Sequence, residues 1–575
     1  MLKDFFKKYG WRYAPGAVFL VLCAWISTRA PLALGKAIEL VTSGDWNAFL
    51  RETLNILWIA LGVFITRDLW RYFIIFTSRE MEVYLRDRLY HHLQLLPLKF
   101  YGEHRSGDLM AYAINDVNAV RMTFGMVIAQ ILNAVSSLMF SVMSMAGEVD
   151  ARLTLLALIP VPFAVAAVLI IGKNVRVRFR RVQELFASIS GHVQENINGM
   201  RVLKAFAQEK PQEEAFARES DEKRRANIRL YHASALLQPM IAVIFGLSYV
   251  IGLVYGGELV LDGRISLGDY VAFNAYLALI VMPINAVGRI ANNLERGVAS
   301  YKRLSALMQE PEIPEFDRVD DKKPITGALR AVDLTYRYPD ASQPALRHIS
   351  FEVPAGGTLG IVGPTGSGKS TLMQLLVKLI PAEPGSLFVD GRDINAIPAA
   401  SLREACGYVP QDGFLFNVSL RENIAFFSGA DQAAVERAAA AAGLAGDVDK
   451  LSDGYDTLCG ERGNHLSGGQ RQRAALARAL VRQPKLLLLD DTLSAVDAHT
   501  ETDILRSLKE EFRGRTAVII AHRLTAVRDA DEILYMEDGE VVERGTHEQL
   551  LARNGKYAAV WESQQREEAK KHAGK

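Results

Sequence analysis

Cysteine is scarce in this chain, with three in 575 residues: Cys23, Cys406 and Cys459. They lie far apart and form no CxxC pair, which argues against a disulfide framework or a zinc site and favours a reducing environment. The chain also lacks an excess of charge of one sign, because 66 Lys and Arg residues are balanced by 65 Asp and Glu. Without a basic field, we do not expect nucleic acid as a partner.

Apolar residues are abundant instead. They make up 50% of the chain, which excludes a disordered protein. Six stretches approach the ~20 residues that a helix needs to cross a bilayer, and we place these spans at 16–38, 54–77, 124–146, 153–172, 235–258 and 268–290. One such stretch could be a buried helix of a soluble protein, but six in succession predict a multi-pass protein embedded in a lipid bilayer. No small-residue cleavage site follows the first stretch, so it is predicted to be an anchor.

Basic residues are unevenly distributed between the connecting segments. They gather at the N-terminus and in two long connections, 79–123 and 173–234, and are few in 39–53, 147–152 and 259–267. The positive-inside bias then predicts that both termini and two long intracellular loops face the cytoplasm, with the chain in a bacterial cytoplasmic membrane. Residues 2–13 read as an amphipathic elbow helix lying on the membrane surface.

The composition changes beyond the sixth span. Residues 311–327 are polar and contain three prolines, as in a linker. Short apolar runs then alternate with helical segments, which predicts a soluble α/β domain with a mainly parallel sheet. The expected domains are a six-helix all-α transmembrane domain (1–310), the linker (311–327), an α/β P-loop nucleotide-binding domain (328–562) and a flexible tail (563–575).

The strongest motif is a glycine-rich loop between an apolar strand (TLGIVG) and a helix (TLMQLLVKLI). It consists of Gly363, Pro364, Thr365, Gly366, Ser367, Gly368, Lys369, Ser370 and Thr371. Glycines let backbone N–H groups curl around phosphate oxygens, and the helix N-terminus adds its dipole. In this pattern the lysine reaches the β/γ-phosphates and the hydroxyl after it ligates Mg²⁺. The motif therefore predicts ATP and Mg²⁺ as cofactors, with Lys369 and Ser370 in those roles.

Two further motifs lie downstream. The run KLLLLD ends in Asp490, where a P-loop enzyme holds its Mg²⁺-side carboxylate. Alone, it could be a plain core strand. The run Leu466, Ser467, Gly468, Gly469 and Gln470 precedes a helical segment. Alone, it could be a glycine-rich turn in which Ser467 caps the helix.

Together, the P-loop, the KLLLLD strand and LSGGQ resemble the ATP-binding cassette (ABC) family. With six preceding spans, nearly the whole chain resembles an ABC exporter half-transporter of the type IV fold. The resemblance implies that Tyr338 stacks on adenine, that Gln411 contacts Mg²⁺ and the attacking water, that Asp497 is the D-loop aspartate, and that His522 is the switch histidine. Mg²⁺ would be held by Ser370, Gln411 and Asp490, and LSGGQ would act on a partner's ATP. The segments FYGEHRSGDLMAYAINDV and ENINGMRVLKAFAQE resemble the two intracellular loops of exporters.

One residue departs from the family pattern. In fully active cassettes, Glu follows the Asp of the Walker B strand, which corresponds to Asp490 here. This chain has Asp491 in place of that Glu. General-base catalysis depends on reach before pKa, and a misplacement of about 1 Å can cost about a hundredfold in rate. We therefore predict that Asp491 makes this chain's own site hydrolyse ATP poorly. An impaired carboxylate with an intact LSGGQ resembles the degenerate-site subunit of heterodimeric bacterial multidrug exporters, whose partner is a different half-transporter with a catalytic Glu. The alternative is a homodimer that hydrolyses slowly with Asp491.

The resemblance implies ATP-driven export of amphipathic or hydrophobic small molecules by alternating access. Aromatic side chains of the spans could line a cavity for such compounds or could face lipid and neighbouring helices: Trp70, Tyr72, Phe73, Phe76 and Phe140. Arg67 and Asp68 are functional candidates because charge within a bilayer is costly, although they could also pair with each other or face water. A lipid flippase or a siderophore transporter would share every motif. A soluble ABC ATPase of repair or translation would not have six spans.

Overall fold

The structure is a computed structural model of the chain, and it describes residues 2–312, 323–339, 341–492, 504, 506–508 and 514–573. Its contacts divide the chain into two units. The first comprises Met1–Gln94 and His104–Glu310, and the second comprises Leu95–Glu103 and Pro311–Lys575. The short segment Leu95–Glu103, which contains helix α6, therefore groups with the C-terminal unit although it lies within the first hundred residues. Of the expected linker, residues 313–322 lie outside the described part.

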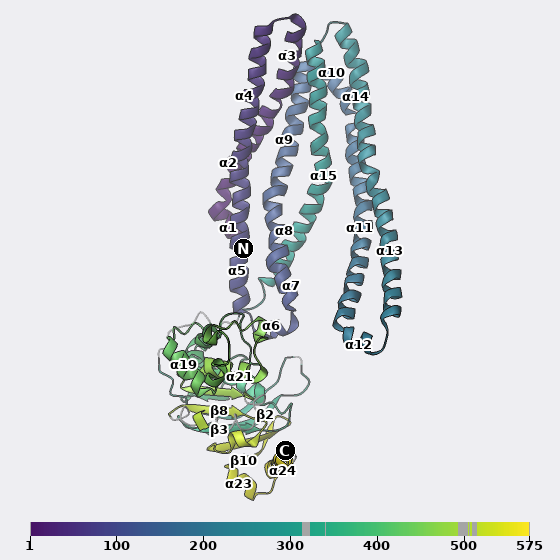
Figure 1. Cartoon of the computed structure of the whole chain (residues 1–575). Coiled ribbons are helices and arrows are strands. Elements are labelled where there is room, and N and C mark those ends of the chain that lie inside the picture. The colour runs from purple at the N-terminus through teal and green to yellow at the C-terminus, as the bar shows by residue number, and fades with distance from the viewer. Residues whose placement is uncertain are drawn as a thin grey trace. The chain divides into compact units, whose positions relative to one another are not determined.

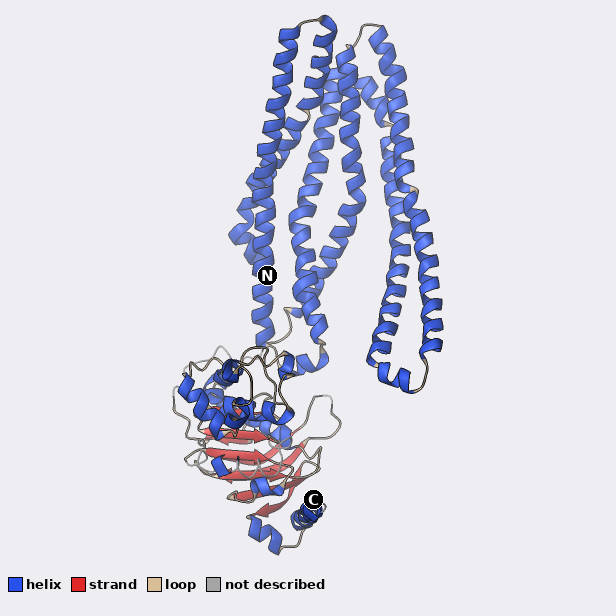
Figure 2. Ribbon diagram, viewed as in Figure 1, coloured by secondary structure: helices blue, strands red, loops and turns tan. Residues whose placement is uncertain are grey.

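The first unit is all helical, and its longest helices run side by side (Figures 1 and 2). In chain order they are α1 (Leu2–Tyr9), α2 (Tyr13–Ser27), α3 (Arg29–Ser43), α4 (Trp46–Arg71), α5 (Thr77–Leu95), α7 (Ser106–Ala111), α8 (Val117–Met122), α9 (Ile128–Ser144), α10 (Ala151–Leu158), α11 (Val161–Asn198), α12 (Met200–Ala205), α13 (Glu209–Ala235), α14 (Leu237–Leu261) and α15 (Leu267–Leu307). Five-residue π-helical turns join several of them into continuous helical stretches. These turns are η2 (Tyr72–Phe76), η3 (Tyr112–Asp116), η4 (Thr123–Val127) and η5 (Met145–Val149).

Six helical stretches of the described chain are long and apolar enough to cross a membrane. They are Leu2–Ser43, Trp46–Leu95, Ser106–Val149, Ala151–Asn198, Glu209–Leu261 and Leu267–Leu307. Each is much longer than the roughly 20 residues that a bilayer requires. The α11–α13 hairpin, closed by the short α12, illustrates this extension (Figure 1). The prediction of six membrane-capable helices is thus confirmed.

Capping side chains set where these helices begin. Asp45 accepts a hydrogen bond from the Ala48 N–H at 3.0 Å at the start of α4, and Asp150 accepts one from Leu153 at 2.7 Å at the start of α10. Ser266 and Asp269 form a reciprocal capping box at the start of α15, with both bonds at 3.0 Å. Such caps satisfy backbone donors that the first helical turn leaves unpaired.

Polar contacts join α5 and η3 to the C-terminal part of α15. The Asp116 carboxylate is buried and accepts hydrogen bonds from Arg303 Nε at 3.1 Å and Ser300 Oγ at 2.7 Å. His92 Nε2 lies 2.9 Å from the backbone oxygen of Leu307. The last helix of this unit is therefore held along its side by two other helical segments.

The second unit is a layered α/β domain (Figure 2). Its strands are β1 (Leu329–Tyr336), β2 (Leu346–Val353), β3 (Thr358–Val362), β4 (Leu387–Val389), β5 (Arg392–Asp393), β6 (Cys406–Val409), β7 (Leu486–Asp490), β8 (Thr516–Ile520), β9 (Glu532–Glu537) and β10 (Glu540–Gly545). Its helices include α6 (Leu98–Glu103), α16 (Lys369–Leu376), α17 (Ala399–Ala405), α18 (Leu420–Ala425), α19 (Gln432–Ala441), α20 (Ala445–Val448), α21 (Gly468–Leu480), α23 (His547–Ala552) and α24 (Lys556–Ala573).

The strands form two sheets. A four-stranded antiparallel sheet has the order β2-β1-β4-β5, and a six-stranded sheet has the order β10-β9-β3-β8-β7-β6. In the larger sheet β9, β3, β8, β7 and β6 are parallel, and β10 pairs antiparallel at the edge. The parallel strands are buried, as their apolar runs require. Six membrane-capable helices followed by an α/β nucleotide-binding domain is the fold class that the sequence predicted.

Candidate nucleotide site

The P-loop connects β3 to α16, at the C-terminal edge of the parallel strands. Three of its glycines have left-handed backbone angles: φ is +148° at Gly363, +85° at Gly366 and +94° at Gly368. A Cβ at Gly363 would collide with the backbone oxygen of Met536, and one at Gly368 would lie 2.5 Å from that of Ala345. The loop therefore needs glycine for both conformation and space, and this shape leaves backbone N–H groups free to curve around an anion.

Lys369 is folded back onto this loop. Its Nζ donates to the backbone oxygens of Gly363 at 2.9 Å and Pro364 at 2.7 Å. Burial lowers the pKa of Lys369, while the nearby carboxylates of Asp490 and Asp491 act in the opposite direction. The amine is thus a buried donor held at the phosphate-binding loop, where an anionic group would offset its desolvation.

Asp490 ends the buried strand β7, next to the first turn of α16. Its Oδ1 accepts a hydrogen bond from Ser370 Oγ at 3.2 Å. Burial raises the pKa of Asp490. A hydroxyl and a carboxylate side by side are hard oxygen donors of the kind that bind Mg²⁺ together with the phosphate oxygens of a substrate. The residues present therefore fit the Mg²⁺–nucleotide pair that the sequence predicted.

Asp491 follows in a left-handed conformation with φ of +49°. Its N–H donates to the backbone oxygen of Ile520 at 3.0 Å, which fixes the residue against the end of β8. The carboxylate is buried and its Oδ2 lies 3.8 Å from His522 Nε2. The fold thus brings together two residues that lie 31 positions apart in the sequence.

One cavity of about 330 Å³ contains most of the predicted site residues. Its lining includes Tyr338, Gln411, Asp490, Asp491 and His522 together with the loop residues Thr365, Gly366, Ser367, Gly368, Lys369, Ser370 and Thr371. Gly363 and Pro364 contribute the backbone oxygens that hold Lys369. The Tyr338 hydroxyl lies 3.2 Å from Thr371 Oγ1, so its ring is anchored at the mouth of the P-loop helix.

Three contributors escaped the sequence analysis. Ala345 and Ile520 line the cavity, but apolar residues of this kind have no chemical signature in a sequence. Gln564 of α24 brackets the segment after β8: its Nε2 donates to the His522 backbone oxygen at 2.8 Å, and its Oε1 accepts from the Leu524 N–H at 3.0 Å. Gln564 falls in the segment expected to be a flexible tail, which is helical as far as Ala573.

The LSGGQ segment lies at the start of α21. Ser467 Oγ accepts from the Gln470 N–H at 3.3 Å, and Gln470 Oε1 accepts from the Ser467 N–H at 2.9 Å, which completes a capping box. Leu466 is buried, and α21 begins at Gly468, so that Gly468 and Gly469 form its first turn. None of these five residues lines the 330 Å³ cavity in the described chain. Asp497, the predicted D-loop aspartate, lies outside the described residues.

Of the span residues that the sequence analysis singled out, some pack against other side chains and others are exposed. Trp70 packs against a buried cluster of Leu20, Ile74 and Ala129, and Phe73 stacks on Phe19 with ring centroids 5.9 Å apart. Tyr72 and Phe76 are exposed, and Phe140 is half-buried. Arg67 and Asp68 are both exposed, and within the described chain no ion pair joins them. The geometry of this chain alone thus assigns packing roles to Trp70 and Phe73 and leaves Tyr72 and Phe76 open.

The fold and the cavity define a P-loop ATPase unit that follows six membrane-capable helices. Two family profiles match the chain: "ABC transporter transmembrane region" over residues 15–284 and "ABC transporter" over residues 346–494. Among curated proteins, the chain is 36% identical to the "Probable multidrug resistance ABC transporter ATP-binding/permease protein YheI" of Bacillus subtilis, covering 98% of this chain and 96% of that protein. It is 33% identical to the "Multidrug resistance-like ATP-binding protein MdlA" of Escherichia coli, covering 99% and 97%.

A solved structure of a bacterial Atm1-family ABC exporter with ATP bound superposes with a TM-score of 0.77 at 28% identity, covering 96% of this chain and 98% of that one. The chain therefore belongs to the ABC transporter family, as an exporter half-transporter with one transmembrane and one nucleotide-binding domain. ATP hydrolysis in such proteins is coupled to transport, and they act as dimers in the membrane.

Proposed function

We propose that this chain is the subunit with the impaired ATP site in a heterodimeric multidrug-type exporter. The observation that supports the proposal is Asp491. It stands where the family's catalytic Glu belongs, and its carboxylate is one methylene shorter. Its backbone is fixed by the hydrogen bond to Ile520, so the chain cannot easily advance to compensate for the lost reach.

In the proposed site, the P-loop residues Gly363 to Thr371 and Lys369 hold the phosphates of ATP. Ser370, Gln411 and Asp490 hold Mg²⁺, which would polarise the phosphate oxygens, and the ring of Tyr338 stacks on adenine. His522 orients toward the γ-phosphate from beside Asp491. Because general-base catalysis depends on reach, ATP binds well here and is hydrolysed slowly.

Pairing with a second chain completes the site. The LSGGQ residues are well formed at the start of α21 but do not line this chain's own cavity. In the proposed head-to-tail dimer they close on the ATP held by the partner's P-loop, with the D-loop residue Asp497 nearby. The partner carries the catalytic Glu, so productive hydrolysis occurs at the site that it shares with this chain's LSGGQ.

The proposed substrate is an amphipathic or hydrophobic small molecule, exported across the bacterial cytoplasmic membrane with both termini of the chain in the cytoplasm. Relatives described as multidrug transporters, YheI and MdlA, support this class. Binding of two ATP molecules closes the cassettes and turns an inward-facing cavity outward, and hydrolysis at the competent site resets it.

A second candidate function is lipid flipping. A protein of Syntrophus aciditrophicus and one of Nitrosococcus oceani, each described as an "ATP-dependent lipid A-core flippase", are 32% and 31% identical to this chain over 86% and 98% of its length. Transport assays with dyes and with labelled lipids in the same proteoliposomes separate these two substrate classes.

ATP turnover by this chain in lipid nanodiscs tests the asymmetric mechanism. We expect near-zero turnover for the chain alone, restoration by a co-expressed partner half-transporter, and loss again when the partner's catalytic Glu is changed to Gln. Rapid vanadate-sensitive turnover by the chain alone would instead establish a homodimer in which Asp491 is a working base.

A further inference from the structure

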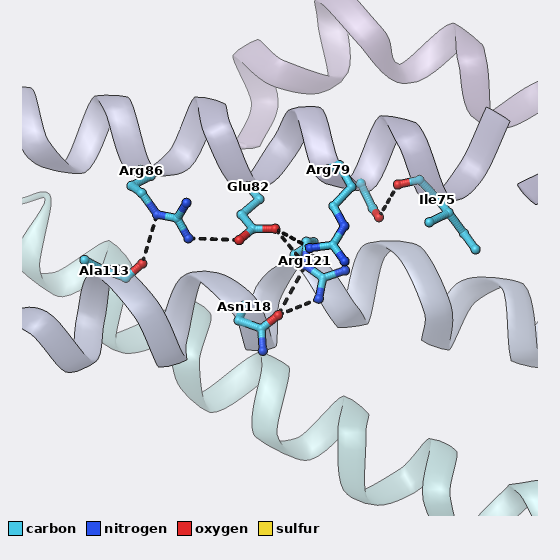
Figure 3. A network of polar contacts seen from close by, with 8 residues as sticks. Ile75, Arg79, Glu82, Arg86, Ala113, Asn118 and Arg121 are labelled. Atoms are coloured by element: carbon cyan, nitrogen blue, oxygen red, sulfur yellow. Dashed lines mark hydrogen bonds and ion pairs between the residues drawn. The ribbon is translucent and has the colours of Figure 1, made fainter. Parts of the chain in front are cut away.

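A cluster of three arginines around one glutamate joins α5 to α8 (Figure 3). Glu82 Oε2 lies 3.0 Å from Arg79 Nη1 and 3.1 Å from Arg121 Nε, and its Oε1 lies 2.9 Å from Arg86 Nη2. Two guanidinium groups therefore share one carboxylate oxygen. The side chains of Glu82 and Arg121 are only 16% and 11% exposed, so the centre of the cluster is shielded from solvent within the chain.

The charges in this cluster do not balance. Three guanidinium groups face a single carboxylate, and the other partners drawn in Figure 3 are neutral. Arg121 Nε donates to Asn118 Oδ1 at 3.2 Å, and Arg86 Nε donates to the backbone oxygen of Ala113 at 3.5 Å. The shielded pair of Arg121 and Glu82 is balanced, so the excess positive charge falls on Arg79 and Arg86.

Arg79 and Arg86 present this excess charge to the outside. Their side chains are 61% and 46% exposed. A guanidinium has five N–H donors, and in the described chain Arg79 uses only Nη1, toward Glu82. Arg86 donates through Nε and Nη2. Donors on Nε and Nη2 of Arg79 and on Nη1 of Arg86 therefore remain available, within the described chain, for a ligand with paired anionic oxygens, which Arg binds better than Lys does.

The cluster lies where an apolar run ends. The second predicted span finishes at residue 77, two residues before Arg79, and the third begins at residue 124, three residues after Arg121. Tyr72 and Phe76, exposed in the turns that precede Arg79, have ring centroids 5.1 Å apart. Exposed aromatic side chains are thus followed directly by arginines along the helical stretch Trp46–Leu95. This order matches that of a phospholipid, in which the acyl chains adjoin the charged headgroup.

We propose that Arg79 and Arg86 bind the phosphate of an anionic phospholipid, beside the shielded pair of Arg121 and Glu82. Basic pockets between transmembrane helices at the cytoplasmic side are suited to anionic headgroups. In the proposed orientation the lipid is in the cytoplasmic leaflet and its headgroup lies on α5, where α5 meets α8. This site requires only that the chain spans the membrane, and not that Asp491 is impaired or that the substrate is a drug.

Native mass spectrometry of the full transporter in neutral detergent tests the site. Titration with phosphatidylglycerol and with phosphatidylcholine of the same acyl chains gives the affinity for each lipid. We expect tighter binding of phosphatidylglycerol, weakened by about fivefold for each arginine removed in Arg79→Gln and Arg86→Gln. Binding of phosphatidylcholine should not change. Glu82→Gln removes the internal counter-charge and should strengthen phosphatidylglycerol binding.

The matched control is Arg218→Gln, which removes an exposed arginine from α13, far along the chain from any predicted span. The proposal is overturned if Arg218→Gln weakens phosphatidylglycerol binding as much as Arg79→Gln, or if Glu82→Gln weakens it as the arginine variants do. Complete displacement of phosphatidylglycerol by millimolar inorganic phosphate would also overturn it, because the site would then be an ion site without a role for lipid.

Discussion

At the residue scale, Asp491 combines a short acidic side chain with an unusual backbone conformation. Its side chain is shorter than the family's Glu, and its backbone lies at φ of +49°. Asp and Asn tolerate the left-handed region better than most residues. Restoring Glu would therefore extend the carboxylate but add backbone strain, and the two effects separate in different measurements: one in hydrolysis and the other in stability.

We expect Asp491→Glu to raise hydrolysis at this chain's own P-loop by about tenfold or more, since recovery of about 1 Å in reach is worth up to a hundredfold. The measurement is single-turnover phosphate release in a dimer whose partner carries Gln in place of its catalytic Glu, so that only this site reacts. Asp491→Asn is the control and should be slower than the unchanged chain. If Asp491→Glu is no faster, reach does not limit this site.

At the element scale, α24 holds the segment that carries His522. Gln564 contacts both the His522 backbone oxygen and the Leu524 N–H. Because an intramolecular hydrogen bond contributes about 0.5–1.5 kcal/mol, the two bonds restrain the segment even though Gln564 itself does not line the cavity. We regard Gln564 as a positioning residue.

Gln564→Ala should lower kcat for ATP roughly tenfold and leave KM nearly unchanged, because His522 loses its orientation while the P-loop keeps its phosphate contacts. The assay uses the Asp491→Glu background with the partner's site inactivated. Gln565→Ala, at the exposed neighbouring position, is the matched control. An equal fall in kcat for both variants, or a rise in KM with unchanged kcat, would contradict the positioning role.

At the scale of the whole molecule, Ser467 serves two functions in the proposed dimer: it caps α21 in its own chain and contacts the partner's ATP. These roles separate by substitution. Ser467→Asp should preserve the cap, because Asp is an equally good N-cap, but it should abolish hydrolysis at the partner's site by placing negative charge against phosphate. Ser467→Ala should cost about 1 kcal/mol of stability. Turnover by the partnered transporter and its thermal unfolding report these effects. Undiminished turnover with Ser467→Asp would show that the LSGGQ segment of this chain does not contact the ATP in the partner's site.

The sequence analysis could predict the features that depend on local patterns of residues. The P-loop, the capping residue Ser467 and six membrane-capable helices all depend on short-range spacing or composition. Gln564 could not be found this way, because QQREEAKK has the composition of a solvated tail and its partners are backbone atoms 40 or more residues away. The left-handed angle at Asp491 was equally hidden, since it arises from pairing with the end of β8. Helices such as Trp46–Leu95 run beyond the apolar spans, as the helix pattern of the long connecting segments predicts, because their polar continuations are helical too.

The grouping of Leu95–Glu103 with the C-terminal unit has a consequence for biosynthesis. The ribosome makes this segment about two hundred residues before the rest of its unit, at about 5–20 residues per second. For roughly ten seconds or longer, α6 exists before the rest of the unit with which it groups. The nucleotide-binding unit therefore cannot reach its final form as an autonomous tail that folds in sequence order. Its completion waits on capture of a segment already tethered to the membrane, which makes this step a natural point for quality control of the newborn transporter.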